Sequence, residues 1–252
     1  MTGVEFARKE VYEILRTWRI WVLPGIVLFF AISGPLLARF TPEIVGALVG
    51  NSLSGLKVPT PTYSDSYIQW IKNLSQILLI AVIIVYGGLV SGEVRSGTVA
   101  LVLTKPLSRN AFITVKAAVH SLFLAVVVMV GALLTWGLTW LIFGTAPGGA
   151  LWNATVAFLA LGVLFVCVMT LLSSLIRSSA GAAGAGLGAY IVLAIAAIWR
   201  PLDDYSPAGL TTQPASLAAG KDVTATWPIA TALVLAIALV ALAGWIFRRQ
   251  DL

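Results

Sequence analysis

The sequence predicts an all-α membrane protein with six transmembrane helices, an N-terminal amphipathic interfacial helix and a short cytoplasmic coupling helix. Of its 252 residues, 59% are hydrophobic and 10% are charged, whereas a soluble domain carries about 25% charged residues. About 20 apolar residues cross a bilayer as a helix, and uncharged stretches of that length recur along the chain. These observations exclude a soluble enzyme and predict a single transmembrane domain over residues 1–252.

The first expected element is a helix over residues 4–18. Apolar side chains recur there at helical spacing, with charged side chains on the other side, which is typical of an amphipathic helix at the cytoplasmic membrane surface. The alternative is a solvated start of the first span. The apolar positions are Val4, Ala7, Val11, Ile14, Leu15 and Trp18. No small-residue cleavage site closes the apolar run that follows, so we expect the first span to stay in the protein.

Six membrane spans follow this helix. The first contains Pro24 and Pro35, each of which can kink a helix. Residues 41–71 are rich in Pro, Ser, Thr and Gly, and we expect an external loop there. The predicted spans cover about residues 20–40, 72–91, 111–143, 151–176, 179–199 and 228–247.

The later spans have their own signals. The third is longer than a bilayer requires, which predicts tilt or projection into the cytoplasm, and glycines and a proline after it predict a tight external turn over residues 144–149. Gly184 and Gly188 in the fifth span form a small-xxx-small pair. This pair favours close packing within the bundle over a dimer interface. Residues 200–227 are expected to form a second external segment.

The distribution of positive residues predicts the orientation. With the N-terminus in the cytoplasm, 11 of the 16 Lys and Arg residues fall inside. This favours both termini in the cytoplasm, where the net charge of +6 faces the headgroups of the lipid bilayer. We therefore expect no nucleic acid partner.

The spans lack the groups that membrane catalysis requires. An intramembrane enzyme needs a nucleophile with a base, or a metal cluster, and ion-coupled carriers use intramembrane carboxylates. No acidic residue lies within a predicted span, and His120 has no acidic neighbour in sequence, so we interpret it as a structural residue. The G-x-x-x-x-G-K-[ST] nucleotide-binding motif is also missing. We predict no catalytic residue and no metal site, and an energy supply from a partner.

The candidate for contact with that partner is the cytoplasmic connection over residues 91–110. Gly92 can break the second span, which places Glu93 in the first turn of a new helix. Pro106 ends this helix and Ser108 can cap the third span. A short amphipathic helix can fit a groove on a soluble partner; the alternative is that it lies on the membrane surface.

This connection resembles the cytoplasmic-loop signature of the ABC-2 type permeases. The resemblance rests on Glu93-x-x-x-Gly97-Thr98, then Leu103-Thr104-Lys105-Pro106-Leu107-Ser108-Arg109, then Lys116. The N-terminal helix, the six spans and Tyr205-Ser206-Pro207 are similar to that family too. The resemblance assigns ATPase coupling to Glu93, Val94, Gly97, Thr98, Leu101, Lys105, Pro106 and Arg109.

The resemblance also implies the partners. It implies a permease subunit of an ATP-binding cassette exporter in a bacterial cytoplasmic membrane. This subunit would pair with a second permease subunit, identical or homologous, over two copies of a cytoplasmic ABC ATPase. The chain itself would hold no cofactor, because ATP and Mg would bind in the partner ATPase.

The leading functional hypothesis is export of a small amphipathic or hydrophobic compound, such as a drug or antibiotic. Aromatic residues could line an apolar pathway, or they could belong to the core and the interfacial aromatic belt. The candidates for the pathway or a dimer interface are Trp136, Trp140, Phe158, Phe165, Gly184 and Gly188. Alternatives are export of an ion or a lipid by the same architecture, and a non-transporting membrane anchor or assembly factor.

Overall fold

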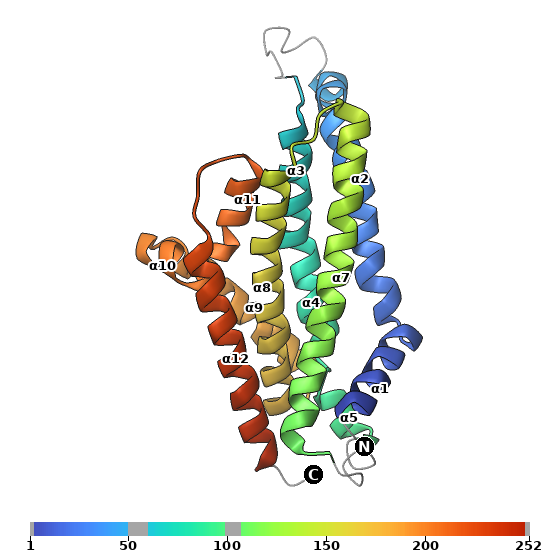
Figure 1. The fold of residues 1–252 in the computed structure, drawn as a ribbon, viewed down its shortest axis with the longest axis vertical. Coiled ribbons are helices and arrows are strands. Elements are labelled where there is room, and N and C mark those ends of the chain that lie inside the picture. Colours follow the sequence, from blue (N-terminus) through green and yellow to red (C-terminus); the bar gives the residue numbers. More distant parts are fainter. Residues whose placement is uncertain (1–2, 50–59, 99–106, 250–252) are drawn as a thin grey trace.

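The protein is an all-α membrane protein. The computed structural model describes residues 3–49, 60–98 and 107–249, and this part of the chain contains no strand. Six of its helices are long and apolar enough to cross a membrane, as predicted. They run side by side along the long axis of the molecule, and both chain ends lie at the same end of the bundle as α5 (Figure 1).

Each predicted span corresponds to a helix or a run of helices. The spans are α2 (Arg19–Val49), the run of α3 (Tyr63–Asn73), η2 (Leu74–Leu78), α4 (Leu79–Tyr86) and α5 (Ser91–Arg95), then α7 (Arg109–Phe143), α8 (Gly148–Leu175), α9 (Ser179–Ala196) and α12 (Thr226–Arg248). The expected tight turn separates α7 from α8, where Gly144 adopts a φ of 72°. The shorter elements are α1 (Gly3–Arg16), α10 (Arg200–Tyr205), η3 (Pro207–Thr211) and α11 (Gln213–Ala218).

The second span begins earlier than predicted. Residues 41–71 were expected in a loop, but residues 41–49 continue α2 and residues 63–71 form most of α3. The Asp65 carboxylate accepts a hydrogen bond of 2.7 Å from the Thr62 backbone N–H, which caps the helix start. Tyr67 and Trp70 are fully buried, so packing against the bundle stabilises a segment whose polar composition favoured a loop. The loop prediction is therefore wrong for these residues.

The break at the end of the second span also lies elsewhere than expected. The helix ends at Tyr86 rather than at Gly92, and α5 starts after a turn. A Cβ on Gly87 would lie 2.6 Å from the backbone oxygen of Ser179, at the start of α9. Only glycine allows this close approach. The break therefore occurs where α9 meets the second span.

Close packing around α9 uses a different pair of small residues from the predicted one. Ala182 and Gly186 are buried, and a Cβ on Gly186 would lie 2.9 Å from a methyl carbon of Ile83. A Cβ on Gly184 or Gly188 would meet nothing within 4 Å. The expectation that Gly184 and Gly188 pack within the bundle is therefore wrong. The glycine-rich sequence offers several pairs at this spacing, and the helix uses one that is offset by two residues.

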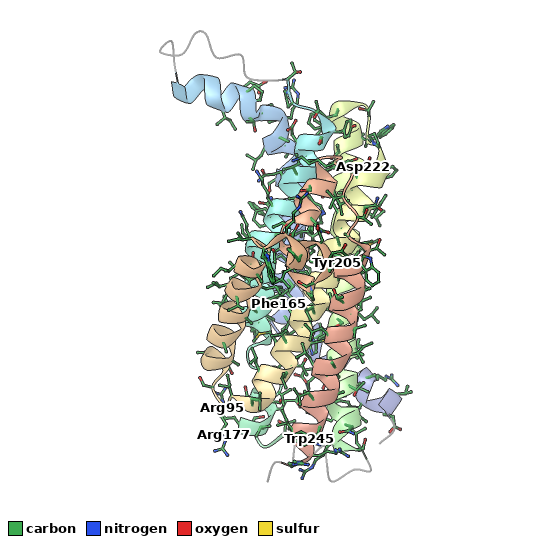
Figure 2. The ribbon with its side chains drawn as sticks, turned by 90° about the vertical axis from the view of Figure 1, so that its left-hand side faces the viewer. Arg95, Phe165, Arg177, Tyr205, Asp222 and Trp245 are labelled. Carbon is green, nitrogen blue, oxygen red and sulfur yellow. The ribbon has the colours of Figure 1, made fainter. Side chains whose placement is uncertain are left out.

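The segment before α12 folds onto the bundle. In η3 and α11, Leu210, Gln213 and Ala218 are buried, and α11 packs against α8 and α3. The Gln213 side-chain amide donates a 2.7 Å hydrogen bond to the Asp203 carbonyl. Asp222 lies toward the end opposite to Arg95, Arg177 and Trp245, and Tyr205 lies about halfway along the bundle (Figure 2).

Candidate functional site

Helix α1 carries an acidic residue on its buried face. Phe6, Glu10 and Ile14 recur every four residues and are buried. The Phe6 ring lies 5.2 Å from the Phe112 ring on α7, between ring centroids, which fixes α1 against that span. Val4 is 80% exposed, so apolar residues on the outer side are free to meet lipid. Location at the cytoplasmic membrane surface stays a prediction.

Glu10 and Glu93 meet the ammonium group of Lys116. Lys116 Nζ donates hydrogen bonds of 2.7 Å to Glu10 Oε2 and 2.9 Å to Glu93 Oε1. The side chains of Lys116 and Glu10 are 0% exposed. A buried charge without a partner costs several kcal/mol. These contacts therefore join α1, α5 and α7 at one point.

Further charges extend this group toward the surface. Lys9 Nζ lies 2.8 Å from Glu93 Oε1 and 2.7 Å from Glu13 Oε2. We call Lys9, Glu10, Glu13, Glu93 and Lys116 the ionic cluster. At its edge, Arg19 lies 3.6 Å from Glu13 and His120 Nε2 lies 3.5 Å from Glu10. With Arg19 included, three carboxylates face three permanent cations, so these charges are close to balanced.

The contacts also explain the pKa shifts in α1. Burial alone would raise the pKa of Glu10, but the contact with His120 and the charges of Lys116 and Lys9 lower it well below its ordinary value of 4.5. Burial alone would lower the pKa of Lys9, but Glu10 and Glu93 raise it above its ordinary value of 10.5. Both groups are therefore charged at neutral pH.

Three carboxylates of the ionic cluster could in principle hold a metal ion. Oxygens of Glu10, Glu13 and Glu93 lie within 4.8 Å of one another. However, Lys9 and Lys116 already donate to these oxygens. Because their ammonium groups supply the positive charge that a cation would bring, the arrangement does not fit a metal site.

The lowered pKa of Glu10 predicts acid sensitivity. Above its ordinary pKa of 4.5, the charged Glu10 carboxylate contributes its full stabilisation to the folded state. This contribution disappears as the pH falls toward the lower pKa that Glu10 has in the folded state. We expect Glu10→Gln to unfold at a lower temperature than wild type at pH 7, and the difference to shrink below about pH 4.5. Thermal unfolding in detergent at several pH values measures this. A difference that stays constant from pH 7 to pH 4 would contradict the role of Glu10.

The predicted coupling residues are divided between the interior and the surface. Glu93 is 9% exposed because it points into the ionic cluster, and Val94 packs beside the cluster of Phe6, Phe112 and Phe247. Gly97 is exposed with a φ of 74°, and the Thr98 hydroxyl lies 2.8 Å from that of Ser96. The predicted coupling residues that lie outside the described part of the chain are Leu101, Lys105 and Pro106.

Arg109 has a structural contact at the same end of the bundle. Its Nη1 donates hydrogen bonds of 3.4 Å and 3.2 Å to the carbonyls of Phe247 and Arg248. These carbonyls end α12, where a positive charge is favourable. Arg109 thus links the start of α7 to the end of the last span.

The predicted aromatic residues do not gather in one place. Phe158 and Phe165 are buried in the core, whereas Trp136 and Trp140 are 40% and 58% exposed on α7. The Trp136 ring N–H donates a 2.8 Å hydrogen bond to the Ala146 carbonyl, across the turn between α7 and α8. Their role in a pathway or a dimer interface stays a prediction.

The ionic cluster was the part of the site that sequence analysis missed. Glu10 and Lys116 are 106 residues apart, so no local pattern connects them. Two signals were available. Lys116 lies inside the third span, and a lysine in such a helix needs an opposing charge. The position of Glu10, four residues from both Phe6 and Ile14, identifies it as inward-facing.

Comparison with known proteins identifies several relatives. Residues 5–202 match the family model for "ABC-2 family transporter protein". "Probable ABC transporter permease protein NosY" of Stutzerimonas stutzeri is 29% identical over 195 residues, which are 75% of this chain and 65% of that protein. The NosY protein of Pseudomonas aeruginosa is 30% identical over 98% of both chains. "Uncharacterized transmembrane protein YxlG" of Bacillus subtilis is 26% identical over 78% of this chain and 79% of that protein.

Proposed function

Because the chain belongs to the ABC-2 family of transporter proteins, we propose that it forms the membrane pathway of an ABC exporter that a separate ATPase subunit drives. Relatives that are named as probable ABC transporter permeases support this proposal. The ATPase binds ATP and Mg in the cytoplasm, in two copies. A second permease subunit, identical or homologous, completes the transporter.

The observation that carries the proposal is the connection of α5 to the spans. Arg95, Ser96 and Gly97 after the buried Glu93 are exposed, so a soluble subunit can reach them. The Ser173 hydroxyl on α8 accepts hydrogen bonds of 2.9 Å and 3.0 Å from the backbone N–H groups of Val90 and Ser91. With the ionic cluster, these bonds tie α5 to α1, α7 and α8.

The attachment of α5 to α1, α7 and α8 supports a mechanical role for α5. An ATPase subunit that changes shape can displace α5 as a rigid body. Because Glu93 is held by Lys116 and Lys9, the displacement reaches α7 and α1 without first breaking buried ion pairs. The energy of ATP hydrolysis thereby changes the packing of the spans, which alternates access to the two sides of the membrane.

The substrate class follows from the central parts of the spans. A compound that moves along them meets mostly apolar side chains, some hydroxyl and amide groups and one imidazole, and no carboxylate. This favours a small amphipathic or hydrophobic compound. The uncharged stretches are residues 20–38, 73–92, 117–143, 148–175, 179–196 and 226–247.

Copurification from the native membrane tests the proposal. We expect a tagged copy of this chain to retain an ATPase with a nucleotide-binding motif, and inside-out vesicles with both subunits to accumulate an amphipathic dye only with ATP. Retention of the ATPase without any ATP-dependent transport would favour a membrane anchor instead. Absence of an ATPase would overturn the exporter.

Two variants test the coupling role of α5. We expect Glu93→Ala and Gly97→Trp to insert normally but to reduce substrate stimulation of ATPase activity by about fivefold or more. Glu93→Ala removes the contact with Lys116, and Gly97→Trp strains a backbone φ of 74°. Gly149→Trp, in open space at the α7–α8 turn, is the matched control. Wild-type stimulation in both α5 variants would contradict the assignment.

A further inference from the structure

Spans α7, α8 and α12 leave an apolar groove between them. The groove has a volume of about 540 Å³, within the range of small-molecule sites. Val163 and Cys167 of α8 form its floor. Its walls include Ala117 and Ala118 on α7 and Ala236 and Ala241 on α12. These methyl side chains are too short to fill the space between the helices, which explains the groove.

The groove faces outward. Leu233 and Ile237 on its α12 wall are 45% and 72% exposed, and Ala118 and Ala241 are exposed as well. All three helices are candidate membrane spans, so the surrounding medium is hydrocarbon. Leu233 to Ala241 rises roughly 12 Å along the helix, close to the ~15 Å of one hydrocarbon leaflet. An acyl chain of one leaflet matches this length.

The end of the groove nearest the chain termini carries polar and positive groups. On α12, Gly244 and Arg248 continue the helix face of Ile237 and Ala241. On α7, Asn110 lies one turn before the groove residue Thr114, and its side chain packs against Gly244. Arg248 is exposed and takes part in none of the ion pairs found among the described residues. A guanidinium in this position matches a lipid phosphate.

We propose that this groove binds one acyl chain of an anionic phospholipid, with the phosphate at Arg248 and Asn110. The lipid belongs to the leaflet at the end of the bundle where both chain termini lie (Figure 1). It fills the space between the third and sixth spans, and its headgroup adds a negative charge where Arg109, Arg248 and Arg249 gather. The groove residues differ from those of the proposed ATPase-docking segment.

Native mass spectrometry of the purified full-length protein, titrated with dioleoyl phosphatidylglycerol, tests the proposal. We expect Ala118→Trp and Ala241→Trp, which fill the groove from exposed positions, to lose the tightest-bound lipid. Val130→Trp, 46% exposed elsewhere on α7, should retain it. Arg248→Gln should weaken binding about fivefold. Arg249→Gln should change binding less, because Arg249 stacks 3.9 Å from the Trp245 ring.

Cysteine labelling gives a second measurement at the site itself. Cys167 is the single cysteine of the chain and forms part of the groove floor. We expect phosphatidylglycerol to protect it from an apolar maleimide in wild type but not in Arg248→Gln at the same lipid concentration. Equal lipid binding by wild type and both tryptophan variants would overturn the proposal. If only a transported compound protects Cys167, the groove binds that compound instead of a lipid. If the tryptophan variants change the oligomeric state, the groove binds a second copy of the chain.

Discussion

Replacing Lys116 with methionine is expected to lower the free energy of unfolding by about 3 kcal/mol, because the fully buried Glu10 carboxylate then keeps only Lys9 as a permanent cationic partner. Glu10 loses its 2.7 Å contact and Glu93 its 2.9 Å contact. Methionine retains most of the volume of lysine, so the change isolates the charge. Equilibrium unfolding in detergent micelles measures the effect.

Two further variants separate charge from packing. Lys72→Met removes an exposed lysine and should change stability by no more than about 0.5 kcal/mol. The double variant Glu10→Gln with Lys116→Met should be more stable than Lys116→Met alone, because the buried negative charge is also removed. If Lys116→Met unfolds like wild type, the ionic cluster does not hold α1, α5 and α7 together.

The second large effect is expected at the contact of α9 with the bundle. Gly186→Leu should destabilise the protein by about 3 kcal/mol, the upper end of the usual range for overpacking. A side chain at this position meets Met169 and Ile83 at once. The flexible Met169 side chain can shift in part, but the Ile83 methyl is attached to its Cβ, so a leucine also requires backbone movement of α9.

Gly184→Leu is the matched control on the same helix. A side chain there meets nothing within 4 Å, so the stability of the monomer should not change. Comparison of the stability changes of Gly186→Leu and Gly184→Leu shows which face of α9 packs against the bundle. Equal destabilisation by the two variants would show that the packed face includes Gly184, in contradiction to the structure.

The spans were predictable because each leaves an uninterrupted apolar run of membrane length in the sequence. The start of the second span could not be predicted in this way. Residues 63–73 are polar on average, and α3 forms there because Thr62 and Asp65 cap it and the bundle buries Tyr67 and Trp70. The helix propensities of these residues do not include the stabilisation that tertiary packing adds.

Only the exposed segment of the candidate site could be predicted from the sequence, and the buried ionic cluster could not. The position of Glu93 in the first turn of a short helix follows from the sequence, but its inward direction does not. Glu10, Glu93 and Lys116 meet only after three helices have packed. The register of α9 presents the same difficulty, since Ala182–Gly186 and Gly184–Gly188 have equal spacing and only packing distinguishes them.

The ionic cluster changes the interpretation of Glu93. As a surface residue it would contact the ATPase directly, but its carboxylate is occupied by Lys116 and Lys9. We therefore propose that the exposed residues that follow Glu93 contact the ATPase. In this proposal, Glu93 holds the segment on the bundle and passes its movement to α7.

Photo-crosslinking in native membranes tests the docking of an ATPase on this segment most directly. A photoreactive amino acid at Arg95, which is exposed directly after Glu93, is expected to capture a protein with a nucleotide-binding motif. The same group at Tyr205, 61% exposed and far from Arg95 in the bundle (Figure 2), should capture none. Capture of an ATPase at Arg95 alone is the predicted result. An ATPase that copurifies with the chain but crosslinks at neither position, or equally at both, would contradict it.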